Sequence, residues 1–186
     1  GYTRSGRFIG QTLAEAAEET GQSVAEFAYD ILLKEQEHQA FVFPWQVDPE
    51  IAETTVRRTA THPRMMVASD GIFNIPHPHP RGCGCFARVL GLFVREHQLI
   101  SLEEAIYKMS GFPARRFGIP DRGELSQGKA ADLVIFDPET VAAQSTFENP
   151  IQAPVGIPWV LVNGTPVIEN GKPTGHLPGR VIRHRK

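Results

Sequence analysis

The chain has 186 residues, which suits one domain or one domain with a small second one. Hydrophobic residues make up 41% and charged residues 22%, a globular composition that argues against wholesale disorder. The 19 lysines and arginines against 21 aspartates and glutamates exclude a strongly basic nucleic-acid binder. No apolar run approaches the length of a membrane span, so we do not expect the chain to cross a membrane. From the charge balance and the missing apolar run together, we expect neither a nucleic acid nor a membrane as partner.

The N-terminal residues and the two cysteines indicate in which cellular compartment the protein is expected. The first residues, starting with Gly1 and Tyr2, have no apolar stretch before a cleavage site, so no signal peptide is expected. The two cysteines, Cys83 and Cys85, are too close in sequence for an unstrained disulfide. Reduced thiols fit the cytoplasm, which is the expected location. The chain does not begin with methionine, so we expect a processed or truncated product.

Four helix starts stand out along the chain. Residues 12–15 and 23–26 each follow the capping-box pattern of Ser or Thr three residues before Glu, and predict helices directly after them. Asp48 before Pro49 marks a third helix start, and residues 101–104 form another capping box. These signals predict a helix-rich first two thirds of the chain.

Two short apolar runs, residues 40–43 and 65–68, have the length and boundaries of buried strands. A helix lies between them, which is the order of parallel α/β structure. Residues 72–85, rich in Pro, His, Gly and Cys, are predicted as a loop, with a helix from residue 86 to about 97. Because two parallel strands cannot cover their own edges, we expect the chain to be part of a larger fold.

The last third changes character and is predicted to be all-β. Residues 132–137, 159–162 and 166–168 read as strands. Asn163-Gly164 is a two-residue hairpin signal between the last two, and Asn170-Gly171 is a further turn. We therefore expect a small separate domain that begins near residue 119.

Asp70 is the first candidate for chemistry, because it directly follows the apolar run at 65–68. A carboxylate at the C-terminal end of a barrel strand can act as a general base or bind a metal. An ordinary Asp-Gly turn, formed with Gly71, is the alternative reading. Ser69 beside it is not a nucleophile elbow, since the Gly-x-Ser-x-Gly pattern is absent.

A His- and Cys-containing cluster follows, and it admits several readings. His77, His79, Cys83 and Cys85 are potential zinc ligands, although the spacing is not that of a usual structural site. The same residues can line a pocket or serve as scaffold. Arg81 between them can clamp a carboxylate through two hydrogen bonds or lie exposed in the loop.

Taken together, these segments resemble the metal-dependent amidohydrolase superfamily, and most specifically its D-aminoacylase (N-acyl-D-amino-acid deacylase) family. The resemblance lies in residues 66–71 (Met-Val-Ala-Ser-Asp-Gly), in 79–81 (His-Pro-Arg) with 86–91 (Phe-Ala-Arg-Val-Leu-Gly), and in 123–137 with 160–164. The last two ranges are widespread among amidohydrolases and identify the superfamily. The His-Pro-Arg segment and its continuation narrow the resemblance to the deacylases.

The resemblance implies an α/β fold: the C-terminal part of a TIM-type (β/α)8 barrel over residues 1–118, then a small β-sandwich domain over 119–186. It implies a hydrolase of amide C–N bonds that acts on small-molecule N-acyl-D-amino acids with zinc as cofactor. It also implies a partner, an N-terminal barrel polypeptide that carries most of the zinc ligands. The chain is expected to be active only in combination with that part.

The resemblance also assigns roles to residues. Asp70 is the expected catalytic residue, which takes a proton from water and returns it to the leaving amine, and it is a candidate metal ligand. Arg81, His79 and Ser69 are the expected substrate-binding residues, with Arg81 on the α-carboxylate. The pair His77 and His79 follows the last strand, so the family's His-x-His ligand role is not transferred to it.

Three alternatives remain open at this point. The first is a cyclic-amide hydrolase of the same superfamily, similar to dihydropyrimidinase. The second is a non-catalytic subunit or remnant that lacks the metal centre. The third is a small metal-binding module built on His77, His79, Cys83 and Cys85.

Overall fold

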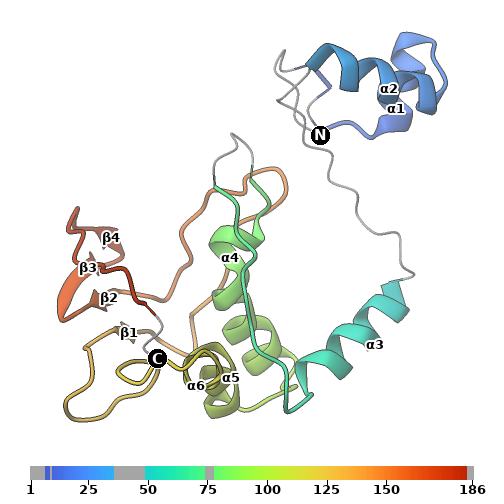
Figure 1. Cartoon of the computed structure of the whole chain (residues 1–186). Coiled ribbons are helices and arrows are strands. Elements are labelled where there is room, and N and C mark those ends of the chain that lie inside the picture. The colour runs from blue at the N-terminus through green and yellow to red at the C-terminus, as the bar shows by residue number, and fades with distance from the viewer. Residues whose placement is uncertain (1–6, 9, 36–48, 74–77, 184–186) are drawn as a thin grey trace. The chain divides into compact units, whose positions relative to one another are not determined.

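A computed structural model describes residues 7–8, 10–35, 49–73 and 78–183 of the chain (Figure 1). The chain divides into two compact units, with the boundary in sequence between Val47 and Asp48. Each unit is considered by itself. Among the described residues, no helix combines the length and the apolar character that crossing a bilayer requires.

The first unit holds two helices, α1 (Leu13–Thr20) and α2 (Val24–Glu35), and both capping boxes predicted from the sequence are confirmed. In the first box, the Thr12 hydroxyl accepts the Glu15 N–H at 3.2 Å and the Glu15 carboxylate accepts the Thr12 N–H at 2.7 Å. Ser23 and Glu26 make the same reciprocal pair. Each box satisfies backbone N–H groups that the first helical turn leaves without an acceptor.

Small and aromatic side chains pack α1 against α2. Ala16 and Ala17 are buried on α1, and Phe27 and Ile31 are buried on α2. Phe8 adds an edge-to-face contact to Phe27, with ring centroids 5.1 Å apart. The core of this unit is therefore local and built from one helical hairpin.

The second unit holds the remaining helices, and two of them start where the sequence predicts. α3 begins at Pro49, and α5 is capped by Ser101, whose hydroxyl accepts the Glu104 N–H at 3.1 Å. The helices of this unit are α3 (Pro49–Ala60), α4 (Arg81–Arg88), the π-helix η1 (Val89–Glu96), α5 (Leu102–Met109) and α6 (Gly111–Arg116).

The loop predicted over residues 72–85 is wrong in its last part, residues 81–85, because α4 already begins at Arg81. Pro80 occupies the N-cap position, where a missing N–H costs nothing. Gly82 and Gly84 fall in the predicted loop but stand inside α4 at close contacts. A Cβ on Gly82 would lie 2.9 Å from Phe73, and one on Gly84 would lie 2.2 Å from the Ser145 Oγ. Close packing thus explains these glycines better than a loop does.

The strand predicted at residues 65–68 is not formed in the described part of the chain. This segment runs without a strand partner, beside α4 in Figure 1. Its Val67 N–H donates instead to the carbonyl of Lys108 on α5 at 3.1 Å. A strand needs a neighbour to pair with, and none stands beside this segment among the described residues. The other predicted strand, residues 40–43, lies outside the described residues.

The β-structure of the last third is confirmed as one antiparallel sheet of four strands, in the order β1-β2-β3-β4. The hairpin turn at Asn163 and Gly164 joins β2 to β3, and both residues have positive φ, as a two-residue turn requires. The strands are β1 (Leu133–Ile135), β2 (Trp159–Val162), β3 (Thr165–Glu169) and β4 (Lys172–Pro173).

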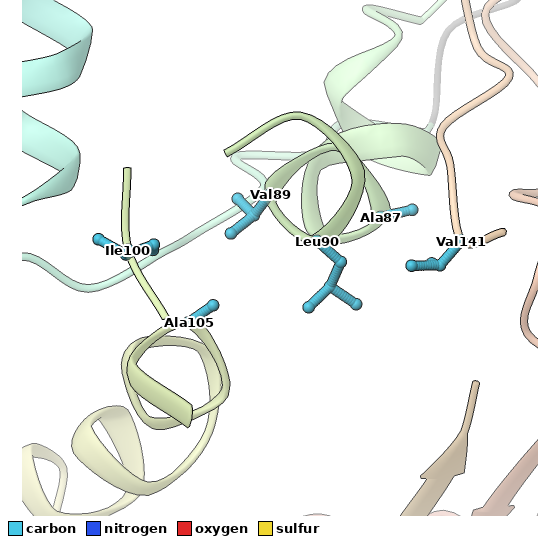
Figure 2. Packing of buried hydrophobic residues seen from close by; sticks show 6 residues of the cluster. All are labelled: Ala87, Val89, Leu90, Ile100, Ala105 and Val141. Atoms are coloured by element: carbon cyan, nitrogen blue, oxygen red, sulfur yellow. The ribbon is translucent and has the colours of Figure 1, made fainter. Parts of the chain in front are cut away.

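The main core of the second unit lies between α4, η1, α5 and the segment around Val141. Figure 2 shows its buried side chains, which are Ala87, Val89, Leu90, Ile100, Ala105 and Val141. Arg95 of η1 donates to the carbonyls of Val141 at 2.7 Å and Pro138 at 3.2 Å. These contacts fix residues 138–141 against η1.

Candidate active site

The candidate site forms where the segment after α3 meets the start of α4. Asp70 ends that segment in a left-handed backbone conformation, with φ of 47°. Aspartate tolerates this region better than most residues, and the following Gly71 N–H donates to the Ser69 hydroxyl at 3.3 Å. The turn leaves the Asp70 side chain exposed.

Arg81, the first residue of α4, holds Asp70 through two contacts. Its Nη2 lies 2.5 Å from Oδ2 of the Asp70 carboxylate, and its Nε donates to the Asp70 backbone carbonyl at 3.0 Å. The guanidinium therefore binds both the side chain and the main chain of the same residue. The structure thus brings together the expected catalytic residue and the arginine expected to bind the substrate carboxylate.

Two glycines make this approach possible. A Cβ on Gly71 would stand 3.1 Å from the Cα of Gly82, closer than most real Cβ contacts. The backbones that carry Asp70 and Arg81 can therefore come together directly. The sequence analysis named Gly71 only as part of a turn and gave Gly82 no role, although their positions immediately after Asp70 and Arg81 were a usable signal.

His79 lies beside Arg81 and is tied to it. Its Nδ1 accepts the Arg81 backbone N–H at 3.1 Å, and its ring meets the Phe147 ring edge-on at 5.0 Å. Burial and the Arg81 charge lower the pKa of His79 below its ordinary value, while Asp70 acts in the opposite direction. Both effects favour the neutral imidazole, and the backbone contact uses Nδ1 as an acceptor.

Ser69 and Cys85 have local structural partners. The Ser69 hydroxyl accepts the Gly71 N–H within the turn. The Cys85 thiol lies 3.5 Å from the Ala68 carbonyl, and burial raises the pKa of this thiol. Both contacts hold the segment before Asp70 in place. Cys83 is a free thiol, as is Cys85.

Among the described residues, no three or more His, Cys, Asp or Glu side chains are grouped so that they could hold a metal ion. His79, Cys83 and Cys85 therefore make no zinc module there, and His77 lies outside the described residues. Asp70 offers a single carboxylate, already engaged by Arg81. This donor set does not fit a zinc centre by itself.

The candidate site is open. A cavity of about 350 Å³ is lined by residues that include Arg115, Arg122 and Glu124, and it contains neither Asp70 nor Arg81. Asp70 stands on a surface, with three quarters of its side chain exposed. An enclosed substrate pocket at this place would need further walls.

The arrangement defines a class. The exposed carboxylate of Asp70 is paired with Arg81, the arginine of a His-Pro-Arg helix start. Both residues lie within the region that a known family shares. The model of the amidohydrolase family matches residues 8–168, and the chain belongs to that family. The resemblance noted from the sequence is confirmed.

Two deacylases are among the relatives that the chain matches. The chain is 50% identical over 131 residues to N-acyl-D-glutamate deacylase of Alcaligenes xylosoxydans xylosoxydans, covering 70% of this chain and 27% of that protein. It is 42% identical over 173 residues to D-aminoacylase of the same organism, covering 93% and 34%. A dihydroorotase of Lactobacillus gasseri shares 43% identity over only 54 residues, 29% of this chain and 13% of that protein.

A solved structure supports the same relationship. N-acyl-D-glutamate deacylase from Bordetella bronchiseptica, complexed with zinc and a phosphonate mimic of the tetrahedral intermediate, superposes with a TM-score of 0.73 at 40% identity. The match covers 88% of this chain and 33% of that one. The chain thus spans between about a quarter and a third of the length of the deacylases it matches.

Proposed function

We propose that this chain is the C-terminal part of a zinc-dependent amidohydrolase that cleaves the amide bond of N-acyl-D-amino acids. The observation that carries the proposal is the Asp70–Arg81 pair, which sets a proton-accepting carboxylate beside a carboxylate-binding guanidinium. The relatives named for this reaction support the substrate class. Reduced Cys83 and Cys85 fit action in the cytoplasm.

In this proposal Asp70 moves the protons. Its carboxylate accepts a proton from the attacking water and returns it to the departing amine. The exposure of its side chain gives water direct access to it. Arg81 takes the α-carboxylate of the substrate, since its planar guanidinium offers paired donors to a carboxylate. His79 and Ser69 complete the proposed substrate-binding wall.

Zinc is proposed as the metal of the complete enzyme, on the support of the zinc-bound relative. Its further ligands would come from outside the described residues, because those residues hold no sufficient donor group. Residues 1–118 would then be the last strands and helices of a (β/α)8 barrel, and residues 119–186 a small β-sandwich domain. The remaining barrel would be supplied by an N-terminal polypeptide.

The test uses the complete amidohydrolase that contains this chain. Asp70→Asn should reduce turnover of N-acetyl-D-amino acids by about a hundredfold or more, the usual contribution of a general base. Asparagine also tolerates a positive φ, so the fold should be kept. Glu53→Gln is the matched control, because Glu53 is also an exposed carboxylate paired with an arginine, Arg57, at 2.6 Å. An active Asp70→Asn enzyme would refute the role.

A cyclic-amide hydrolase is the second candidate function, and the dihydroorotase match favours it to a limited extent. That match covers 54 residues against 131 for the glutamate deacylase. Parallel assays on N-acetyl-D-amino acids and on dihydroorotate separate the two. Faster turnover of the cyclic substrate would reverse the proposal. Native mass spectrometry with metal analysis tests the third possibility, a remnant without partner polypeptide or zinc.

A further inference from the structure

We infer that Lys108 of α5 is a positioning residue for the candidate site, because it holds the start and the middle of the segment that ends at Asp70. This inference rests on the proposed function and adds to it a residue that acts through the main chain. The segment, residues 61–70, connects the end of α3 to the turn that carries Asp70. The course of this segment therefore decides where the Asp70 side chain is presented.

The ammonium of Lys108 fixes the start of the segment. Its Nζ donates to the carbonyl oxygens of Ala60 at 2.5 Å and His62 at 3.0 Å, and it pairs with the Glu104 carboxylate at 2.8 Å. An ammonium has three N–H donors, so these three oxygens can use all of them. Because Ala60 ends α3, the lysine fixes the direction in which the chain leaves that helix.

The main chain of the same lysine fixes the middle of the segment. The Lys108 carbonyl accepts the Val67 N–H at 3.1 Å, and the Val67 side chain packs against the main core of the second unit. Val67 shortly precedes Asp70 in the chain. The side chain and the main chain of one residue thus hold the segment at His62 and again at Val67, and the position of α5 sets both points.

The burial of Lys108 is unusual for a lysine and calls for a reason. Its side chain is only 2% exposed, and taking an ammonium out of water is costly unless its donors are paired. An apolar side chain of similar length could fill the same space, but it offers no donor to the two carbonyls. A role that depends on holding these carbonyls therefore explains why a lysine stands at this buried place.

The far end of the segment is held from a different helix. Cys85 and Arg81 of α4 contact the carbonyls of Ala68, at 3.5 Å, and of Asp70, at 3.0 Å. Arg81, the residue proposed to bind the substrate carboxylate, therefore keeps its place when α5 releases the start of the segment. The Asp70 side chain would then be less well aligned with the bound substrate, which lowers kcat more than it changes KM.

The experiment compares Lys108→Met with Arg95→Met in the complete enzyme. Arg95 is the matched control, because it is also a long cationic side chain that donates to two carbonyls, those of Val141 and Pro138, in a different segment. Lys108→Met should lower kcat for an N-acetyl-D-amino acid by about tenfold or more and leave KM within about twofold. Arg95→Met should leave both constants within about twofold of the wild type. Circular dichroism confirms that each variant is folded at the assay temperature.

Glu104→Gln separates the carbonyl contacts from the ion pair. It removes the negative charge beside Lys108 but leaves the carbonyls of Ala60 and His62 in place, and the glutamine oxygen still accepts a hydrogen bond. Its kcat should stay within about twofold of the wild type. A loss as large as that of Lys108→Met would overturn the inference. Unchanged kcat in Lys108→Met, or an equal loss in Arg95→Met, would overturn it as well.

Hydrogen exchange gives a readout that does not depend on turnover. In the wild type, the Val67 N–H should exchange about as slowly as the amides of α5, because its acceptor is the Lys108 carbonyl. In Lys108→Met, the exchange of Val67 should become about tenfold faster relative to the amides of α5.

The exchange rates also keep the inference testable if Lys108→Met does not fold. A Val67 N–H that exchanges as fast as an unprotected amide in the wild type would overturn the inference without any variant. If the wild type cleaves no N-acyl-D-amino acid, the proposed function fails. The exchange rates then still decide whether Lys108 holds the segment that leads to Asp70.

Discussion

The ammonium of Lys108 on α5 donates to the carbonyl oxygen of Ala60, the last residue of α3, at 2.5 Å. The same nitrogen reaches the His62 carbonyl at 3.0 Å and the Glu104 carboxylate at 2.8 Å. Its side chain is only 2% exposed. A buried lysine therefore satisfies carbonyls at the C-terminal end of α3, where a cation is also favoured by the helix dipole.

Lys108→Met should destabilise the protein by about 2–4 kcal/mol, because two backbone carbonyls and a carboxylate lose their partner. Urea unfolding of both proteins measures the difference. The control is Lys34→Met, which removes an exposed lysine that pairs with Asp30 one helical turn away at 3.6 Å. It should change stability by less than about 0.5 kcal/mol. Equal losses in the two variants would contradict the argument.

Gly156 is predicted to be intolerant of any side chain. Its φ is +75°, and a Cβ would stand 2.5 Å from the Val141 backbone nitrogen. Gly171 has the same φ but open space around it. Gly156→Ala should therefore cost about 3–5 kcal/mol, the sum of left-handed strain and overpacking. Gly171→Ala should cost only the strain, about 1–2 kcal/mol.

Thermal and urea unfolding of the two alanine variants test this pair of predictions. The shared φ cancels in the comparison, so the difference isolates the clash with the backbone around Val141. A difference within about 0.5 kcal/mol would mean that this backbone moves aside at little cost.

The features that the sequence predicted correctly depend on residues close together in the chain. Thr12 and Glu15 form a capping box within one turn, and Asn163 with Gly164 sets a hairpin, so neither needs distant neighbours. Contacts between residues a few positions apart determine both structures, so the local sequence is enough to predict them.

The features that were missed or wrong depend on distant partners. The segment 65–68 has the composition of a strand, but no described strand lies beside it to pair with. Lys108 looks like a surface residue, and only the end of α3, 48 positions away, makes its burial favourable. Gly82 reads as a loop residue until the Phe73 ring, 2.9 Å from where a Cβ would stand, shows why a side chain is crowded there. The residue types alone do not show which distant segments of the chain come into contact.

Asp132 should make stability depend on pH. Burial acts to raise the pKa of its carboxyl, but the Asn163 N–H at 2.7 Å and the Arg122 guanidinium outweigh it, so the pKa lies below its ordinary value. A carboxyl with a lowered pKa in the fold stabilises above its unfolded pKa, and that stability is lost as pH falls through the folded value.

Asp132→Asn should therefore have a lower free energy of unfolding than the wild type near neutral pH. This difference in free energy should disappear in acid. Urea unfolding at a series of pH values from neutral to acid checks this. Asp121→Asn is the control, because Asp121 is more exposed and lies 3.9 Å from the same arginine. A gap for Asp132→Asn that stays constant into acid would show that the substitution acts through packing and not through the charge.

His79 should report the charges of the candidate site. Burial and the Arg81 guanidinium lower the pKa of His79, and the Asp70 carboxylate acts to raise it. Arg81→Gln should therefore raise the His79 pKa toward its ordinary value, and Asp70→Asn should lower it further. The hydrogen bond from the backbone N–H of residue 81 to Nδ1 of His79 remains in the Arg81→Gln variant, because the backbone is unchanged.

An NMR pH titration of the His79 ring measures both shifts. Arg57→Gln serves as control, because its ion pair with Glu53 lies on α3, outside the candidate site, and it should leave the His79 pKa unchanged. Opposite signs in the two site variants would show that His79 senses both charges of the Asp70–Arg81 pair. Shifts of the same sign would mean that rearrangement of the loop, and not the lost charge, controls this histidine.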